Sequence, residues 1–134
     1  MNYQLAPSEK TEVVATQIVD AALEVHRALG PGYLESVYEA AFTYELTLRS
    51  ICFERQCVVP IFYKERLVGE SRLDLIVGKL VVVELKAVPA MLPIHTAQVL
   101  SYLKATSIEL GFILNFGAAR MKDGARRLVR THTP

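Results

Sequence analysis

Residues 72–86 read RLDLIVGKLVVVELK, two apolar runs joined near Gly78, and this pattern predicts a β-hairpin. Three charged residues, Asp74, Glu84 and Lys86, lie inside these otherwise apolar runs. Burying an ionised carboxylate is costly unless a counter-charge or a metal ion compensates it. The hairpin therefore predicts either a divalent-metal site or, as the alternative, a structural ion pair between the lysine and its acids.

The register of the hairpin decides whether its two carboxylates meet. A two-residue turn would leave Asp74 and Glu84 on opposite faces of the sheet, whereas a three-residue loop centred on Lys79 places them opposite each other. We expect the second register, because it also pairs Leu73 with Leu85, Leu75 with Val83, and Val77 with Val81. Directly opposed side chains lie about 4.5–5.5 Å apart at Cβ, so the carboxylates repel unless a cation separates them. Lys86 shares their face, because strand side chains alternate.

The composition indicates one globular domain without a general affinity for polyanions. The chain has 134 residues, of which 51% are hydrophobic, and we expect a single domain over 1–134 with its core at about 11–130. Its 15 basic and 14 acidic residues leave it almost neutral, so any nucleic-acid contact must be local. Such a small domain offers little surface to surround a duplex, which favours a homodimer or a partner protein without choosing between them.

The sequence also favours a cytoplasmic protein that does not contact a membrane. The apolar runs are too short and too often interrupted by charge to span a bilayer, and the N-terminus lacks the order of a signal peptide. Cys52 and Cys57 match no metal-binding spacing and are expected to be reduced.

Hydrophobic periodicity predicts an α/β fold, with a mixed sheet flanked by helices. The expected helices cover 11–29, 34–49 and 94–106, the last with Ala97, Leu100 and Leu103 on one face. The expected strands cover 53–63, where Pro60 indicates an edge or a bulge, the two runs of the hairpin, and 110–116, which should be covered on both faces. A turn is expected at 64–66, and the basic tail from 118 should end in a short strand or a frayed segment.

The arrangement Asp74…Glu84-Leu85-Lys86 resembles the signature of the PD-(D/E)XK nuclease superfamily. Three further stretches resemble the GxxExxY family within that superfamily, and the resemblance spans about residues 18–128. These stretches are GYLESVYE at 32–39, LPIHTAQ at 92–98 followed by Tyr102-Leu103, and GFILNFG at 111–117.

The resemblance implies a restriction-endonuclease-like core and a site that cuts phosphodiester bonds with Mg²⁺ or Mn²⁺. It makes Asp74 and Glu84 the metal-binding carboxylates, and Lys86 the group that orients or activates water. The backbone carbonyl of Leu85 could add a further ligand. Glu35 matches the acid that superfamily members place on an early helix. Mg²⁺ prefers oxygen ligands and often takes only one or two carboxylates, which agrees with this set.

The helices around the hairpin offer supporting residues, each with a plainer alternative. Glu35 shares a helical stripe with apolar residues and is expected to face inward. The alternative is a capping or surface acid, because the helix dipole favours negative charge in the first turn. Gln98 and Tyr102 lie four residues apart and can point together toward the sheet edge, where Gln98 would hold a water or a phosphate oxygen; polar packing is the alternative. His95 lines the cleft or simply starts the helix.

A basic cluster near the C-terminus could bind a phosphate backbone, or it could be a solvated tail. It comprises Arg120, Lys122, Arg126, Arg127 and Arg130. Together these features predict a metal-dependent nuclease acting on DNA or RNA. The competing prediction is a non-catalytic nucleic-acid-binding or regulatory module that keeps the fold.

Overall fold

The computed structural model describes residues 3–4 and 6–132. Its elements are β1 (Tyr3–Gln4), α1 (Glu9–Leu29), α2 (Glu35–Leu48), β2 (Phe53–Tyr63), β3 (Arg66–Val77), β4 (Val81–Lys86), α3 (Pro93–Thr106), β5 (Leu110–Asn115), α4 (Met121–Gly124), β6 (Ala125–Val129) and β7 (Thr131–His132). The order of the long elements agrees with the order that the sequence predicts.

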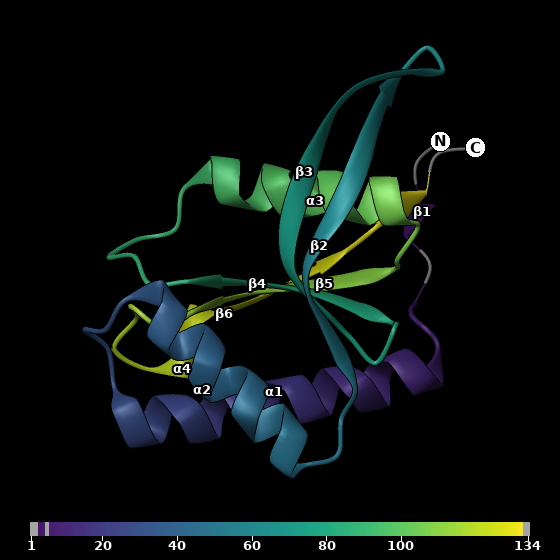
Figure 1. Ribbon diagram of the computed structural model, residues 1–134. Helices are drawn as coiled ribbons and strands as arrows, with labels where there is room; N and C mark the ends of the chain where they lie inside the picture. The colour runs from purple at the N-terminus through teal and green to yellow at the C-terminus, as the bar shows by residue number, and fades with distance from the viewer. Residues whose placement is uncertain (1–2, 5, 133–134) are drawn as a thin grey trace.

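A five-stranded mixed sheet forms the centre of the fold, in the order β2-β3-β4-β5-β6. Only β4 and β5 run parallel, and helix α3 makes the crossover that a parallel connection needs. Helices α1 and α2 lie on one side of the sheet and α3 on the other (Figure 1). The expected α/β architecture is therefore confirmed, and it is that of a restriction-endonuclease-like core. A separate two-stranded pair, β1 with β7, joins the two ends of the described chain.

Helix α1 begins and ends where local chemistry dictates. The hydroxyl of Ser8 accepts the backbone N–H of Thr11 at 3.2 Å, which caps the first turn. Gly30 ends the helix with φ of 68°, a left-handed conformation that glycine adopts without steric cost. One face of α1 is buried against the sheet, with Ile18, Ala21 and Ala22 fully inaccessible.

The two faces of the sheet bury separate apolar clusters. One cluster joins α1 and α2 to the odd-numbered residues of β4, such as Val83 and Leu85. The other joins α3 to Val82 and Ile113. All six residues of β5 are buried, which confirms the prediction of a strand covered on both faces.

Of the three residues that the sequence places on one face of the helix over 94–106, only Leu103 is buried. Helix α3 buries Val99, Tyr102 and Leu103, whereas Ala97 is exposed and Leu100 retains 39% of its accessible surface. Both sets have helical spacing, so periodicity alone does not choose between them. Placing the Tyr102 ring and Val99 against the sheet removes more apolar area from water than burying an alanine would.

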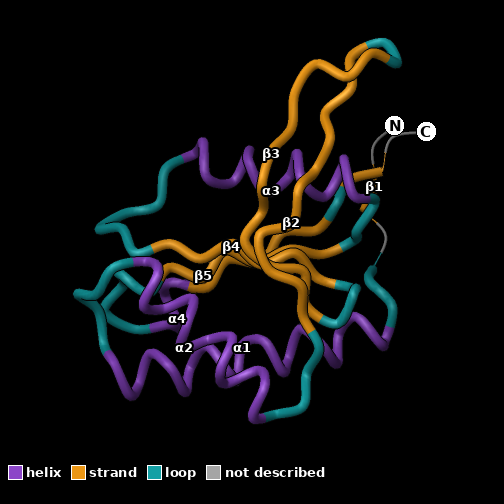
Figure 2. The backbone as a smooth tube through the Cα atoms, viewed as in Figure 1, coloured by secondary structure: helices purple, strands orange, loops and turns teal. Residues whose placement is uncertain are grey.

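Strand β2 lies at the edge of the sheet, as Pro60 predicts, and the register with β3 shifts between Ile61 and Phe62. The turn between the two strands lies at Lys64 and Glu65, both with positive φ. Beyond its short ladder with β4, the β2–β3 hairpin continues as a two-stranded ribbon that projects from the body of the molecule (Figures 1 and 2). We call residues 58–72 of this ribbon the arm.

The basic tail is more ordered than the sequence suggests. Residues 125–129 form β6, which pairs antiparallel with β5 and becomes the second edge of the main sheet. Ladder hydrogen bonds and the packing of Leu128 and Val129 against the two cores hold it there. Among the described residues, no helix combines the length and apolar character needed to cross a membrane.

Candidate active site

The β3–β4 hairpin adopts the register that brings its acids together. Leu75 pairs with Val83 and Val77 with Val81, and the loop between them is centred on Lys79. Gly78 and Lys79 both have φ near 60°, which lets the chain reverse within this short loop. The predicted loop and its apolar pairs are confirmed up to Leu75.

Beyond Leu75 the two strands part, and their carboxylates take over the hydrogen bonds. The Asp74 backbone N–H donates to Oε1 of Glu84 at 2.7 Å, and the Leu85 backbone N–H donates to Oδ2 of Asp74 at 2.8 Å. The backbone ladder does not continue to the expected Asp74–Glu84 and Leu73–Leu85 pairs. We call this arrangement the fork. Each carboxylate reaches across to the opposite strand, so the predicted proximity holds although the regular pairing stops.

Burial raises the pKa of both carboxyls in the fork. Glu84 keeps only 5% of its accessible surface, and desolvation followed by the charge of Asp74 raises its pKa to about 7. Desolvation also raises the pKa of Asp74, while the N–H of Leu85 acts in the opposite direction. Lys86 favours ionisation of both acids, yet no ion pair within 4.0 Å joins it to either one among the described residues. The fork is therefore an acidic site without full compensation by a neighbouring side chain.

Glu35 approaches the fork from the first turn of α2. Desolvation and then the charge of Asp74 raise the pKa of its carboxyl, and Lys86 lowers it, so all three groups share one electrostatic environment. The expectation that Glu35 faces inward is wrong, because its side chain is exposed to solvent. A position at the helix start lets the carboxylate remain hydrated while it faces the acids of the sheet.

Tyr102 and Gln98 occupy different environments on α3. Tyr102 is 5% exposed, and burial followed by the charges of Glu84 and Asp74 raises the pKa of its phenol. The ring of Tyr102 packs with Val82 and Ile113 on the α3 side of the sheet, within the electrostatic influence of the fork, and not at the sheet edge that the sequence predicts. Gln98 is exposed, and no hydrogen bond of its side chain occurs among the described residues.

A protein-family model described as the PD-(D/E)XK nuclease superfamily matches residues 12–128. The chain belongs to this superfamily. The match includes the fork, Lys86, Glu35 and α3. No curated protein and no solved structure matches the chain.

The donor set of this PD-(D/E)XK domain suits a hard divalent cation. Asp74, Glu84 and Glu35 offer only oxygen atoms, which Mg²⁺ and Mn²⁺ prefer over softer ligands. Within the part of the chain that the structure describes, no group of three or more acidic, histidine or cysteine side chains is close enough to enclose a metal. Mg²⁺ is commonly held by one or two carboxylates, with water and substrate oxygens completing its shell, so the fork fits such an ion.

Three residues beside the fork were missing from the sequence prediction. Glu39 accepts Nη2 of Arg55 at 2.6 Å and Nε2 of Gln56 at 2.9 Å, and so ties α2 to β2. Gln56 lies between the residues paired with Leu75 and Leu73 and has φ of 51°, and its side chain acts to lower the pKa of Asp74. The charge of Glu39 raises the pKa of Asp74. The four-residue spacing of Glu35 and Glu39 on one helix face was the signal available in the sequence.

The stretches at 32–39 and 111–117, which resemble the GxxExxY family, have structural roles as well. Tyr38 is fully buried, donates its hydroxyl to the carbonyl oxygen of Gly30 at 2.5 Å, and stacks on Phe116 with ring centroids 4.6 Å apart. Asn115 accepts the N–H of Val88 at 3.0 Å and donates to its carbonyl oxygen at 3.0 Å. A Cβ at Gly117 would lie 2.3 Å from that carbonyl oxygen, so only glycine fits. These contacts fix the chain that leaves β4 just after Lys86.

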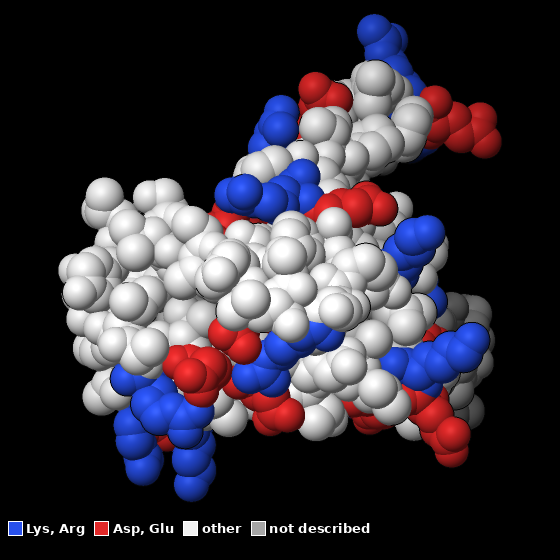
Figure 3. Space-filling view, turned by 60° about the horizontal axis from the view of Figure 1, so that its bottom comes forward, with Lys and Arg blue, Asp and Glu red and all other residues white. Residues whose placement is uncertain are grey.

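The predicted nucleic-acid contacts do not form one basic surface. Nδ1 of His95 accepts the N–H of Leu92 at 3.1 Å, which is the helix-start role left open by the sequence. Arg127 donates to both carboxylate oxygens of Glu12, at 2.7 and 2.9 Å, and Arg126 donates to the hydroxyl of Thr96 at 3.1 Å. Basic and acidic side chains are interspersed on the face shown in Figure 3.

Proposed function

We propose that this chain is a Mg²⁺- or Mn²⁺-dependent nuclease of the GxxExxY family, which hydrolyses phosphodiester bonds in DNA or RNA. The observation that carries the proposal is the fork: a buried and a half-buried carboxylate, Glu84 and Asp74, whose oxygens face each other's strand without a paired cation among the described residues. A site that raises the pKa of Glu84 to about 7 is costly to the fold and is typical of a functional centre.

In the proposed mechanism, Asp74 and Glu84 would hold the metal, with the carbonyl oxygen of Leu85 as a further ligand. Glu35 does not lie close enough to enclose an ion together with them, so it would reach the metal through a water molecule or after its side chain moves. The bound ion supplies a water of lowered pKa and neutralises charge on the phosphate oxygens. Lys86 donates from Nζ to the attacking water or to a phosphate oxygen, and stabilises the negative charge that develops there. Asp74, Glu84 and Lys86 lie on strands of the sheet, and this rigid support fixes how their side chains are oriented toward the substrate.

Residues from α3 and β6 complete the proposed site. Gln98 holds a water or a phosphate oxygen, and His95 contacts the nucleic acid from the same helix. Tyr102 is 5% exposed, so its burial leaves little of the side chain for the contact that the sequence predicts. Arg126 and Arg127 contact its backbone from β6. Arg127 must then exchange its bidentate partner Glu12 for a phosphate, which makes its contact the weakest of these.

The test compares wild type with Lys86→Ala on a panel of labelled single- and double-stranded DNA and RNA. Each reaction contains Mg²⁺, Mn²⁺ or a chelator. We expect metal-dependent cleavage by wild type and a loss of at least about 100-fold in the variant, because Lys86 acts on the transition state. Lys10→Ala, an exposed lysine in the first turn of α1, is the matched control and should cleave like wild type.

A nucleic-acid-binding or regulatory module without turnover is the second candidate. The almost neutral net charge and the interspersed charges of Figure 3 favour it, since they offer little nonspecific grip on a duplex. Wild type that binds labelled nucleic acid but leaves it intact in every metal condition would support this candidate over the nuclease. Titration of Mn²⁺ by calorimetry into wild type and Asp74→Asn tests the metal site separately, and equal heats for both proteins would contradict it.

A further inference from the structure

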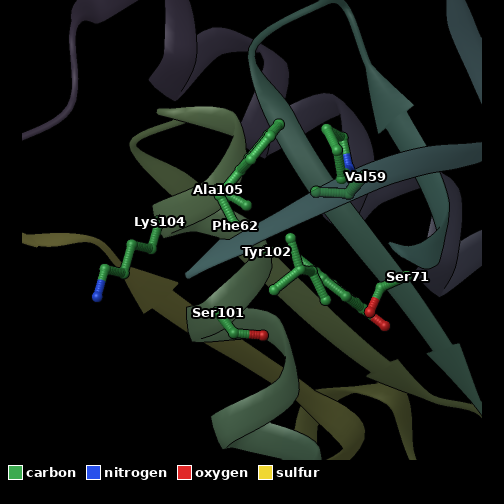
Figure 4. A pocket seen from close by; sticks show the side chains of 9 residues that line it. Val59, Phe62, Ser71, Ser101, Tyr102, Lys104 and Ala105 are labelled. Carbon is green, nitrogen blue, oxygen red and sulfur yellow. The ribbon is translucent and has the colours of Figure 1, made fainter. Parts of the chain in front are cut away.

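A groove at the base of the arm lies between the arm and α3 (Figure 4). It has a volume of about 400 Å³, within the ~300–1,000 Å³ of pockets that hold small molecules. Hydroxyl and ammonium groups reach it from Ser71, Ser101 and Lys104. The rest of its wall is apolar or aromatic and consists of Val59, Pro60, Ile61, Phe62, Tyr102 and Ala105. The groove therefore suits a molecule that has apolar faces and a polar edge.

The groove continues toward the fork through Tyr102, which lines it from α3. The Tyr102 ring packs in the same cluster as Val82, and Glu84 shares the sheet face of Val82 because strand side chains alternate. Burial, followed by the charges of Glu84 and Asp74, raises the pKa of the Tyr102 phenol. On the opposite wall, Ser71 precedes Asp74 by three residues of β3, which is about 10 Å along the strand. A polymer whose phosphate lies at the fork can therefore place a neighbouring unit in the groove.

The polar groups of the groove match the edge of a nucleobase and a phosphate beside it. The Ser101 hydroxyl donates to the carbonyl oxygen of Gln98 at 2.7 Å, so its own oxygen remains an acceptor for an N–H of a base. The Ser71 hydroxyl can donate or accept, and Lys104 is an exposed cation. None of the described residues that line the groove is acidic, in contrast to the fork. This set of groups favours an anionic ligand that carries hydrogen-bonding rings.

The charge of the whole chain indicates that the bases themselves must be contacted. A formal net charge of +1 offers few phosphate contacts, and Arg55, Arg120 and Arg127 already pair with acids. Stacking on an aromatic ring is another source of affinity, and Phe62 keeps 61% of its accessible surface beside the groove. Paired bases hide their faces within the duplex stack, so only an unpaired base can enter.

We propose that the groove binds an unpaired nucleobase beside the phosphate held at the fork, so that the substrate is single-stranded DNA or RNA, or a single-stranded segment. Phe62 stacks on the base, the hydroxyls of Ser71 and Ser101 contact its edge, and Lys104 contacts a flanking phosphate. The inference rests on the proposed nucleic-acid function and adds the strand form on which the site acts.

Fluorescence anisotropy of short labelled oligonucleotides tests this preference on the full chain. Wild type is titrated into a single strand and into the duplex of the same sequence, with Ca²⁺ in place of Mg²⁺, because Ca²⁺ also takes oxygen ligands. Gel electrophoresis after each titration shows whether the strand is intact. We expect the single strand to bind at least about tenfold more tightly, since a duplex must first lose the pairing and stacking of one base.

Variants of two neighbouring aromatic residues separate stacking from general contact with the arm. Phe62→Leu keeps an apolar side chain but removes the aromatic face, so it should weaken binding of the single strand at least about fivefold. Phe62→Trp keeps such a face and should bind like wild type. Tyr63→Leu is the matched control, because Tyr63 is similarly exposed, at 63%, but does not line the groove; its affinity should be unchanged.

Filling the groove tests its role directly. Ala105→Leu adds an apolar side chain to the wall from an exposed helix position, and it should weaken binding of the single strand as much as Phe62→Leu does. Ala40→Leu makes the same change at an exposed position of α2 and should have no effect. A fluorescent purine analogue within the strand reports whether a base leaves its neighbours on binding. Its emission should change with wild type and Ala40→Leu, but not with Ala105→Leu.

The outcomes separate this inference from the proposed function. Thermal unfolding of each variant shows that it is folded, and Phe62 is exposed enough that its replacement leaves the core intact. Equal affinity for single strand and duplex, or wild-type affinity in Phe62→Leu or Ala105→Leu, would overturn the inference and leave the groove to a protein partner. None of these readouts requires cleavage, whereas a wild type that binds but never cuts contradicts the nuclease alone. A wild type that binds no oligonucleotide would overturn both.

Discussion

The acids of the fork and the acid on the surface of α1 are held in opposite ways. Glu84 is buried and Asp74 half-buried; both accept backbone N–H groups, and desolvation raises the pKa of each. Glu12 is exposed, receives a bidentate arginine, and the hydrogen bonds of Arg127 lower its pKa. The surface pair is complete within the chain, whereas the fork has no paired cation among the described residues. This difference is what we expect between carboxylates that serve the proposed metal site and one that serves only the fold.

The largest expected effect concerns the pH dependence of stability. Because the pKa of Glu84 is about 7 in the folded protein and near 4.5 in the unfolded chain, the folded state binds more protons between these values. Without metal, the free energy of unfolding should therefore fall as pH rises through this window, by about 3 kcal/mol from this group. Glu84→Gln removes the penalty and keeps an acceptor for the Asp74 N–H, so the variant should be the more stable protein at about pH 8.

Urea unfolding of wild type and Glu84→Gln at about pH 5 and about pH 8, both with chelator, measures this difference. Glu45→Gln is the control, because Glu45 lies on α2 in an ion pair with Arg49 and away from the fork. A stability difference between wild type and Glu84→Gln that does not change with pH would show that the fork carries no such penalty. Added Mn²⁺ should remove most of the penalty in wild type and have little effect on the variant.

Much of this contrast was predictable from local sequence. A two-residue turn would place Leu73 opposite Glu84, whereas the loop centred on Lys79 places every apolar residue of the hairpin opposite an apolar one, so the pattern over 72–86 predicts the observed register and the proximity of Asp74 and Glu84. The strand over 53–63 has the predicted bounds, because β-branched and aromatic residues fill it and turn residues bound it.

The rest depends on contacts between distant segments. Beyond Leu75 the strands separate, and the carboxylates of Asp74 and Glu84 accept the backbone N–H groups of the opposite strand in place of backbone carbonyls. Residue preferences for helix or strand do not predict hydrogen bonds of this kind. The contact of Glu39 with Gln56 requires the packing of α2 against β2, which single-residue preferences do not specify. The sequence did not predict the exposure of Glu35, because helical spacing gives only the side of the helix on which a residue lies. Glu35 is the first residue of α2, where a side chain on the inner side is still open to solvent.

An intermediate effect is expected at Glu39. Its charge raises the pKa of both Glu35 and Asp74, so the same negative potential should attract a cation to the fork. Glu39→Gln keeps an acceptor for Gln56 but removes the charge, and we expect it to weaken Mn²⁺ binding about fivefold. Calorimetric titration at constant pH measures the change, with Glu45→Gln as the matched glutamate of the same helix. Equal affinities in these two variants would mean that Glu39 is a structural tie alone.

The smallest effect is expected at the surface pair. The lowered pKa of Glu12 gives stability that is present above its unfolded pKa and is lost as pH falls, opposite in sign to the fork. Water and salt screen this exposed pair, so Glu12→Gln should change the melting temperature by less than about 4 °C, and wild type and variant should coincide in about 1 M NaCl. Scanning calorimetry in low and high salt measures both quantities. A large decrease in the melting temperature of Glu12→Gln that persists in high salt would contradict the comparison. It would mean that the ion pair between α1 and β6 contributes as much to stability as the fork does.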